Sequence, residues 1–200
     1  MKKVAKIISA AFHPITLPTW MMAMLLFTGL ARFQQVNPLV FLAMAFVNSF
    51  LLPFIIIVLM KQWKVIKSIN MDDRGDLAST LIIMMLFLYA THRFFAGVPI
   101  FSIYCFYVTS VMVLYAIAFV VNLFCKVSLH ALGCGGLVCC LFVLSTASAH
   151  VYLPYLICGI LLSGAILSSR LLLAKNSQAQ VYSGFGVGFT LTFIMYAIML

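Results

Sequence analysis

Residues 126–147 read KVSLHALGCGGLVCCLFVLSTA, a short polar hinge followed by an apolar run. The hinge, residues 126–130, carries a lysine, a serine and a histidine, whereas residues 131–147 carry no charged side chain. Ala131, Gly133 and the neighbouring glycines are small enough to let helix backbones approach closely in lipid. The stretch therefore predicts a central helix of a membrane bundle, entered through a polar hinge.

The composition assigns the whole chain to a lipid environment. Of its 200 residues, 66% are hydrophobic and 8% are charged, whereas roughly a quarter of the residues in soluble domains are charged. The mean hydropathy is +1.21. Several apolar runs exceed the ~18 residues that mark a spanning helix, and none alternates as a barrel strand does. We expect an all-α integral membrane protein, a helical bundle of six to seven transmembrane helices in a single membrane domain, residues 1–200.

The chain is expected to alternate apolar segments with short connectors. Residues 1–14 form a basic lead that is expected to lie at the membrane interface. Pro53 is expected to kink the second segment, residues 97–99 form the turn of a helical hairpin, and His150 and Pro154 mark a later turn. The expected segments are residues 15–31, 39–60, 77–95, 100–124, 131–147, 155–167 and 181–200.

Polar side chains gather in three clusters, residues 67–74, 126–130 and 169–180. Two expected segments separate each cluster from the next, so all three clusters emerge on the same side of the membrane. Ten Lys and Arg residues fall on that side and two, Arg32 and Arg93, on the other. By the positive-inside rule the clusters face the cytoplasm. We expect a multi-pass protein of the bacterial inner (plasma) membrane.

The formal net charge of +9 does not indicate nucleic-acid binding, because the 12 Lys and Arg residues are confined to short connectors. The expected partners are the lipid bilayer and a membrane lipid phosphate. The six cysteines lack the spacing of a zinc or redox site and are interpreted as packing residues, so no metal and no cofactor are expected. They are Cys105, Cys125, Cys134, Cys139, Cys140 and Cys158.

The first cluster holds Lys67 and Arg74 with six residues between them. Two fixed cations at the membrane surface suit an anionic headgroup, since Arg offers a planar fork and Lys a compact charge. The alternative is an ordinary basic connector in which Asp72 and Asp73 neutralise their neighbours.

The other two clusters supply a histidine, a serine and an arginine. His130 stands at the mouth of an apolar helix and is a candidate general acid or base, or else it only hydrogen-bonds at the interface. Ser128 is expected to cap the helix, where backbone N–H groups attract an anion. Arg170 ends an apolar segment, and the alternative to anion binding is that it extends to the headgroup region.

Together the clusters resemble the motifs of the type 2 phosphatidic acid phosphatase superfamily, membrane enzymes related to the vanadium haloperoxidases. The family's first motif is Lys, six residues, Arg-Pro, and its second is Pro-Ser-Gly-His. Lys67 and Arg74 have the first spacing, with Gly75 in place of proline. Ser128 and His130 occupy the serine and histidine positions of the second motif.

The third motif of the family is Ser-Arg, five residues, His, three residues, Asp. Ser169 and Arg170 match its start, whereas Asn176 replaces the histidine and Gln180 replaces the aspartate. The resemblance covers residues 61–200, which would form a phosphatase-like core.

The resemblance implies a role for each matched residue. Lys67, Arg74, Ser128 and Arg170 would bind phosphate, and His130 would protonate the leaving alcohol. The remaining catalytic positions are those of the nucleophile and of the group that orients it, Asn176 and Gln180 in this chain. An amide at position 176 has no basic lone pair with which to attack phosphorus.

Three functions stay open at this point. The first is hydrolysis of a phospholipid or isoprenyl phosphate with another nucleophile. His92 and His150 fall on the opposite side by the crossing count, and His13 lies on the near side but is remote in sequence. The second is a catalytically inactive relative that binds or moves phosphorylated lipid. The third, a transporter or channel subunit, lacks the support of mid-membrane charges or an inverted repeat.

Overall fold

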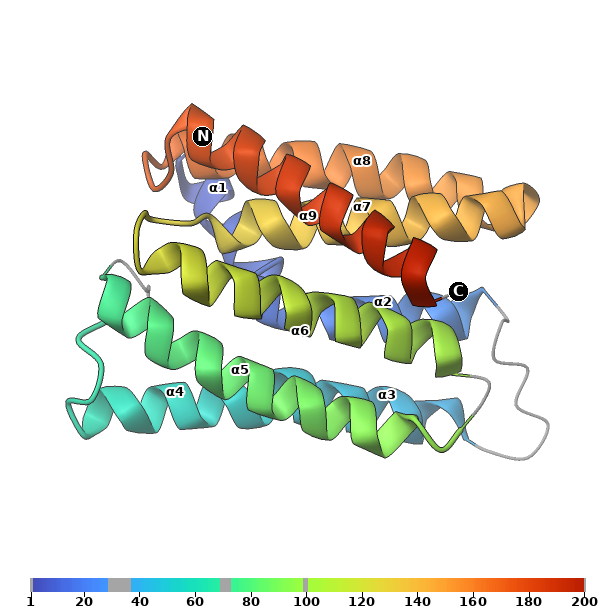
Figure 1. Ribbon diagram of the computed structural model, residues 1–200, viewed down its shortest axis with the longest axis horizontal. Coiled ribbons are helices and arrows are strands. Elements are labelled where there is room, and N and C mark those ends of the chain that lie inside the picture. Colours follow the sequence, from blue (N-terminus) through green and yellow to red (C-terminus); the bar gives the residue numbers. More distant parts are fainter. Residues whose placement is uncertain (1, 29–36, 69–72, 99–100, 200) are drawn as a thin grey trace. The chain divides into compact units, whose positions relative to one another are not determined.

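The computed structural model describes residues 2–28, 37–68, 73–98 and 101–199, and describes Lys2 and Ala10 by their backbone alone. Within these residues the chain forms helices and no strand (Figure 1), which confirms the all-α class. Arg32, Asp72 and Pro99, which entered the sequence argument, lie outside the described residues.

Six helices in the described ranges are long and apolar enough to cross a membrane, and a bent pair near the N-terminus raises the number to seven. The number agrees with the predicted six to seven, and the helices indicate a multi-pass membrane protein. The six are Pro38–Gln62, Arg74–Phe95, Ser102–Asn122, Leu129–Ala147, Ala149–Leu172 and Gln178–Met199; the bent pair is Lys3–Ser9 with Pro14–Phe27.

The chain divides into two compact units. Unit 1 comprises Met1–Leu17 and Ser128–Leu200, and unit 2 comprises Pro18–Val127. The single membrane domain stays a prediction, and each unit is described by itself.

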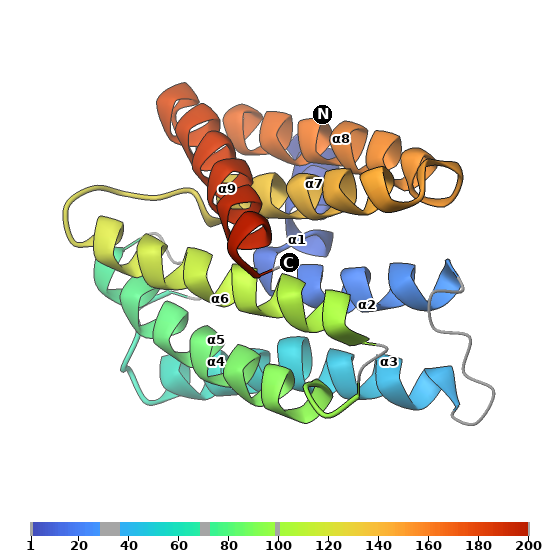
Figure 2. The same ribbon diagram turned by 45° about the vertical axis from the view of Figure 1, so that its right-hand side comes forward.

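Unit 1 contains four helices, α1 (Lys2–Ala11), α7 (Leu129–Ala147), α8 (Ala149–Leu172) and α9 (Gln178–Met199). Helix α7 packs against both α8 and α9, and α1 packs against α8 (Figures 1 and 2). In its most apolar stretch α7 is 78% buried, against 22% for α8 and for α9. Within unit 1, α7 is therefore the central helix that its small residues predicted.

Glycines bring α7 and α9 into backbone contact. A Cβ added to Gly188 would collide with the carbonyl oxygen of Leu132, and one added to Gly135 would collide with that of Phe185. Gly184 also faces α7, whereas a Cβ on Gly186 would meet nothing within 4 Å. Gly186 is therefore not on the face that meets α7, because residues two apart lie on different sides of a helix.

One residue, Ser148, joins α7 to α8, so the two helices run antiparallel. Its extended backbone (φ −154°, ψ 90°) ends α7, and α8 begins at once with Ala149. The predicted turn at His150 and Pro154 is wrong, since both belong to α8. Pro154 lies inside α8 and has no N–H to donate to the His150 carbonyl oxygen.

Unit 2 contains α2 (Leu17–Phe27, from Pro18 on), α3 (Pro38–Phe46), α4 (Leu52–Gln62), α5 (Arg74–Phe95) and α6 (Ser102–Asn122). Helix α5 packs along α6, and α4 packs along α5. A π-helical turn, Val47–Leu51, joins α3 to α4 just before Pro53. The irregularity thus lies where Pro53 predicted a kink, because proline cannot donate to the preceding turn.

Candidate functional site

The second and third polar clusters meet at one end of unit 1. Helix α7 begins at Leu129 and its antiparallel neighbour α8 ends at Leu172, so the start of one lies beside the end of the other. A short connector then leads into α9, which begins at Gln178. The three helix ends bring His130, Arg170 and Asn176 into one cluster, the polar end of unit 1.

Ser128 is the N-cap of α7. Its backbone is extended, and its Oγ accepts a hydrogen bond from the Ala131 N–H at 3.4 Å. The hydroxyl is buried, with 2% of the residue exposed. Ser128 therefore caps the helix as predicted, and the free N–H groups of this first turn stay oriented toward the polar end.

Arg170 connects the elements of the polar end. Its Nε donates to Asn176 Oδ1 at 2.9 Å, and its Nη1 donates to Ser9 Oγ at 3.2 Å. The guanidinium is half-buried and these two acceptors are neutral oxygens. Arg170 is therefore fixed inside unit 1, where an anion can share its fork of donors.

Gln180 belongs to a capping box at the start of α9. Its N–H donates to Ser177 Oγ at 3.2 Å, and its Oε1 accepts from the Ser177 N–H at 3.0 Å. The same Oε1 accepts from Asn176 Nδ2 at 3.4 Å, and Asn176 is buried. Gln180 therefore holds the helix start and orients Asn176, which in turn presents its oxygen to Arg170.

His130 is buried and hydrogen-bonded to the N-terminal helix. Its Nε2 lies 3.1 Å from the backbone oxygen of Ser9 and 3.5 Å from Ser9 Oγ. Because a carbonyl oxygen only accepts, Nε2 must carry the proton and donate. Nδ1 then bears the lone pair of the neutral ring.

Two residues of the site, Ser9 and His13, were not assigned to it from the sequence. Ser9 hydrogen-bonds with both His130 and Arg170, and the ring centroid of His13 lies 5.2 Å from that of His130, edge to face. The interfacial position of residues 1–14 stays a prediction, and within unit 1 helix α1 packs on α8 with Ala5 and Ser9 buried. The feature of the sequence that could have predicted this packing is the pair of small residues, Ala5 and Ser9, one helical turn apart.

The electrostatic setting of His13 keeps its imidazole neutral. Burial, and secondly the positive charge of Arg170, lower the pKa of His13 from 6.5 to about 4. His13 Nδ1 accepts a hydrogen bond from the Ile15 N–H at 3.4 Å. Near neutral pH the charge of the polar end thus comes from Arg170 and not from this histidine.

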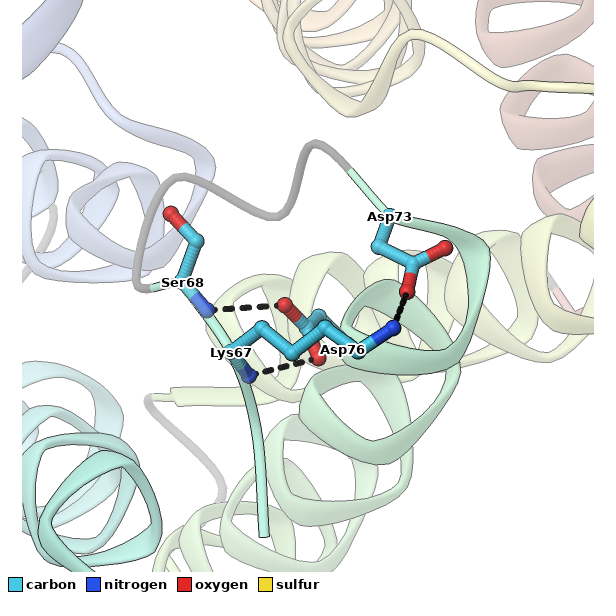
Figure 3. A network of polar contacts seen from close by, with 4 residues as sticks. All are labelled: Lys67, Ser68, Asp73 and Asp76. Carbon is cyan, nitrogen blue, oxygen red and sulfur yellow. Dashed lines mark hydrogen bonds and ion pairs between the residues drawn. The ribbon is translucent and has the colours of Figure 1, made fainter. Parts of the chain in front are cut away.

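The first cluster lies in unit 2 and has acidic partners of its own (Figure 3). Lys67 Nζ forms an ion pair with Asp73 at 3.0 Å, with side chains 83% and 50% exposed. The hydrogen bond and charge of Asp73 raise the pKa of Lys67, and the same contact lowers the pKa of Asp73. The Asp76 carboxylate accepts the N–H groups of Lys67 and Ser68 at 3.0 and 2.8 Å.

Arg74 is the first residue of α5, with an exposed side chain. Its backbone oxygen accepts a hydrogen bond from Asn122 Nδ2 at 2.9 Å. The first cluster therefore lies beside the end of α6. This end is four residues before Lys126 of the second cluster, so within unit 2 the two clusters lie on the same side, as the crossing count predicts. The structure thus gathers Ser128, His130, Arg170, Asn176 and Gln180 in one unit and Lys67 with Arg74 in the other.

No group of three His, Cys, Asp or Glu side chains in the described part of the chain could hold a metal ion. The comparisons with known proteins add no assignment: no family model, no curated protein and no solved structure matches the chain. The resemblance to the phosphatidic acid phosphatases therefore depends on the motif residues alone.

Proposed function

We propose that this protein binds the phosphate headgroup of a membrane lipid, a phospholipid or an isoprenyl phosphate, at the polar end of unit 1. The observation that carries the proposal is the half-buried Arg170 fork, fixed by the neutral oxygens of Ser9 and Asn176. A fork that is already oriented loses little side-chain entropy when it binds a phosphate.

The charge balance of unit 1 favours an anionic ligand. All three acidic residues of the chain, Asp72, Asp73 and Asp76, belong to unit 2. The sequence of unit 1 contains five basic residues and no acidic side chain, a formal net charge of +5; they are Lys2, Lys3, Lys6, Arg170 and Lys175. The first turn of α7 adds the positive end of its helix dipole.

A lipid suits this position better than a soluble phosphate does. Helices α7, α8 and α9 are long enough to cross the hydrocarbon core, and the polar end is at their termini. A headgroup at the membrane surface would therefore meet Arg170 while its acyl or isoprenyl chain stays between apolar helix faces. The proposed location is the plasma membrane, with the site on the cytoplasmic face.

Binding without hydrolysis is the simpler form of this function. Asn176 cannot attack phosphorus, and its oxygen already accepts from Arg170. On this view the protein is a phosphatase-like relative that binds or moves phosphorylated lipid. Replacing Asn176 by His and Gln180 by Asp would then be expected to introduce phosphate release where the wild type shows none.

Calorimetric titration tests the binding. The detergent-solubilised protein is titrated with short-chain phosphatidic acid, with short-chain phosphatidylcholine and with inorganic phosphate. We expect Arg170→Ala to weaken phosphatidic acid binding about tenfold to a hundredfold, because a charge-assisted contact is lost. Tighter binding of phosphatidic acid than of inorganic phosphate identifies the lipid as the ligand.

Arg93→Ala is the matched control. Arg93 also lies in the last turn of an apolar helix, α5, but its side chain is exposed and belongs to unit 2. Its replacement should leave the affinity unchanged. Equal affinity of the wild type and Arg170→Ala for phosphatidic acid would contradict the proposal.

A further inference from the structure

The N-terminal helix α1 has two different faces. Ala5 and Ser9, one helical turn apart, are buried, and α1 packs on α8. Val4 and Ile7 are instead exposed, at 58% and 68%. Because a helix turns by about 100° per residue, position 7 lies opposite the side that carries positions 5 and 9. Helix α1 therefore has an apolar outer side that the described residues leave exposed.

Two lysines adjoin this apolar side. Lys3 and Lys6 are exposed, and Lys3 is a helical neighbour of both Lys6 and Ile7. The sequence of unit 1 contains no acidic side chain that could pair with either lysine. Apolar residues beside lysines on one short helix are typical of helices that bind the interface of an anionic bilayer. We call Lys3, Val4, Lys6 and Ile7 the outer face of α1.

The inner side of the same helix orients the candidate site. The backbone oxygen of Ser9 accepts a hydrogen bond from His130 Nε2 at 3.1 Å, and Ser9 Oγ accepts from Arg170 Nη1 at 3.2 Å. Arg170 is the cation of the proposed phosphate site. The position of α1 on α8 therefore determines how Arg170 and His130 are held.

The packing of α1 on unit 1 buries little apolar surface. Helix α1 has 10 residues, and isolated helices shorter than about 12–15 residues are marginal in water. Among its described side chains, those of Ala5 and Ser9 are buried, and both are small. The chain that follows is held differently, since Pro14 and Ile15 are buried. A contact on the outer face would thus help to decide whether Ser9 stays at Arg170.

We propose that the outer face of α1 binds the anionic surface of the bilayer, and that this contact holds Ser9 against Arg170. The inference rests on the proposed function, because the site that α1 regulates is the phosphate site at the polar end of unit 1. It adds a second partner, the anionic lipids around the bound one. Phosphorylated lipid should then bind more tightly in a negatively charged membrane than in a neutral one.

Hydrogen exchange of α1 tests the contact. The full chain is reconstituted in vesicles of phosphatidylcholine, with or without phosphatidylglycerol, and the exchange of the α1 amides is followed by mass spectrometry. We expect these amides to exchange at least about fivefold more slowly in the anionic vesicles, because one lysine near an anionic surface contributes about that factor to binding. The double substitution Lys3→Gln/Lys6→Gln should abolish the difference.

Lys61→Gln/Lys64→Gln is the matched control, because it removes two exposed lysines of the same spacing from unit 2. It should retain the wild-type difference between the two vesicles. Arg170→Ala should retain it too, since the contact is made by the outer face and not by the phosphate site. Equal exchange of wild-type α1 in both vesicles would overturn the inference. Loss of the difference in Arg170→Ala would also overturn it, by showing that phosphatidylglycerol acts through the phosphate site.

The affinity for short-chain phosphatidic acid, measured in the same anionic vesicles, tests the coupling between α1 and the site. We expect Lys3→Gln/Lys6→Gln to bind about fivefold more weakly than Lys61→Gln/Lys64→Gln, which has lost the same charge. Equal affinities of the two variants would overturn the coupling and leave the proposed function intact. No affinity of the wild type for phosphatidic acid in either vesicle would overturn the proposed function, while the exchange of α1 still shows whether its outer face binds the anionic surface.

Discussion

The polar end of unit 1 and the first cluster, residues 67–74 in unit 2, both contain basic residues, but the partners of those residues differ. In unit 2, Lys67 pairs with Asp73 on an exposed connector. In unit 1, Arg170 is half-buried and hydrogen-bonds to Ser9 and Asn176, which are neutral. The spacing of basic residues therefore identifies their positions in the sequence but not the partners that surround each of them.

Burial and partner chemistry explain this difference. An exposed ion pair is screened by water and salt, so each charge is already compensated and has little to gain from a ligand. The guanidinium of Arg170 instead donates to neutral oxygens from two different segments, Ser9 and Asn176, so its contacts fix its position in unit 1. Four substitutions or conditions test this contrast.

The largest effect is expected from Gly188→Ala, which separates the helices of unit 1. The new Cβ would collide with the Leu132 carbonyl oxygen, a backbone atom that cannot move aside, so α9 must shift from α7. Overpacking costs about 1–3 kcal/mol, and a backbone obstacle places this substitution at the upper end. Thermal unfolding with a thiol-reactive dye measures it, since Cys134 and Cys140 in α7 are buried.

Gly186→Ala is the control, because a Cβ there meets nothing within 4 Å. It should unfold like the wild type. Mapping the labelled peptides also separates the units: Cys134 should react early in Gly188→Ala while Cys105, buried in α6 of unit 2, keeps its wild-type profile. Equal stability of the two alanine variants would show that α7 and α9 are not in backbone contact.

The next effect concerns acid sensitivity in unit 1. Because the pKa of His13 is lowered to about 4, the unfolded chain binds a proton between pH 6.5 and pH 4 that the folded protein does not. Stability should therefore decrease as the pH falls through this window, by up to about 3 kcal/mol from this group. Melting temperatures of the wild type and His13→Gln at pH 7 and pH 4.5 measure it.

His13→Gln should lose less stability than the wild type over that pH interval. His130, which contacts the His13 ring, and Arg170, whose charge acts on it, both remain in the variant. His150→Gln, an exposed replacement on α8, should retain the full wild-type pH dependence. A His13→Gln profile parallel to that of the wild type would mean that His13 is protonated as readily in the folded protein as in the unfolded chain.

Several features of both units could be predicted from residue patterns. Long apolar runs predict helices because lipid leaves the backbone no other partner, and counting them brings the second and third clusters to one end. Ser177 and Gln180 also form a readable S-x-x-Q capping box, which explains the glutamine without a catalytic role. The capping box can be recognised in the local sequence because Ser177 and Gln180 lie within a few residues of each other.

Contacts across the chain could not be predicted in this way. Ser9 meets Arg170 over 161 positions, and no pattern around Ser9 names its partner. The packing of α1 on α8, in which Ala5 and Ser9 are buried, is a tertiary contact that the amphipathic pattern of residues 1–14 does not specify. The crossing count could not predict that His13 lies beside His130 for the same reason. It gives the side of the membrane on which a residue lies, but not the residues that it contacts.

A moderate effect is expected from Asp76→Ala, which removes the anchor of the Lys67 connector. The buried carboxylate accepts the backbone N–H groups of Lys67 and Ser68, and the variant leaves both donors without it. Hydrogen bonds to a charged group are worth about 1.5–3 kcal/mol, so unit 2 should lose about 2 kcal/mol. Denaturant unfolding followed by the reactivity of Cys105 measures it, and unchanged reactivity would contradict the anchoring role.

The smallest effect is expected from Lys67→Gln, and it decides what the first cluster does. The ion pair with Asp73 contributes above the usual Asp pKa and is lost as the pH falls through the lowered pKa of Asp73. At neutral pH the exposed pair adds little, so stability should not change measurably. Because Lys67 is compensated within its own unit, affinity for phosphatidic acid should stay within about twofold, against the tenfold or larger loss in Arg170→Ala. A loss as large as that of Arg170→Ala would instead mean that Lys67 leaves Asp73 for the headgroup, and that the two basic regions act on one ligand.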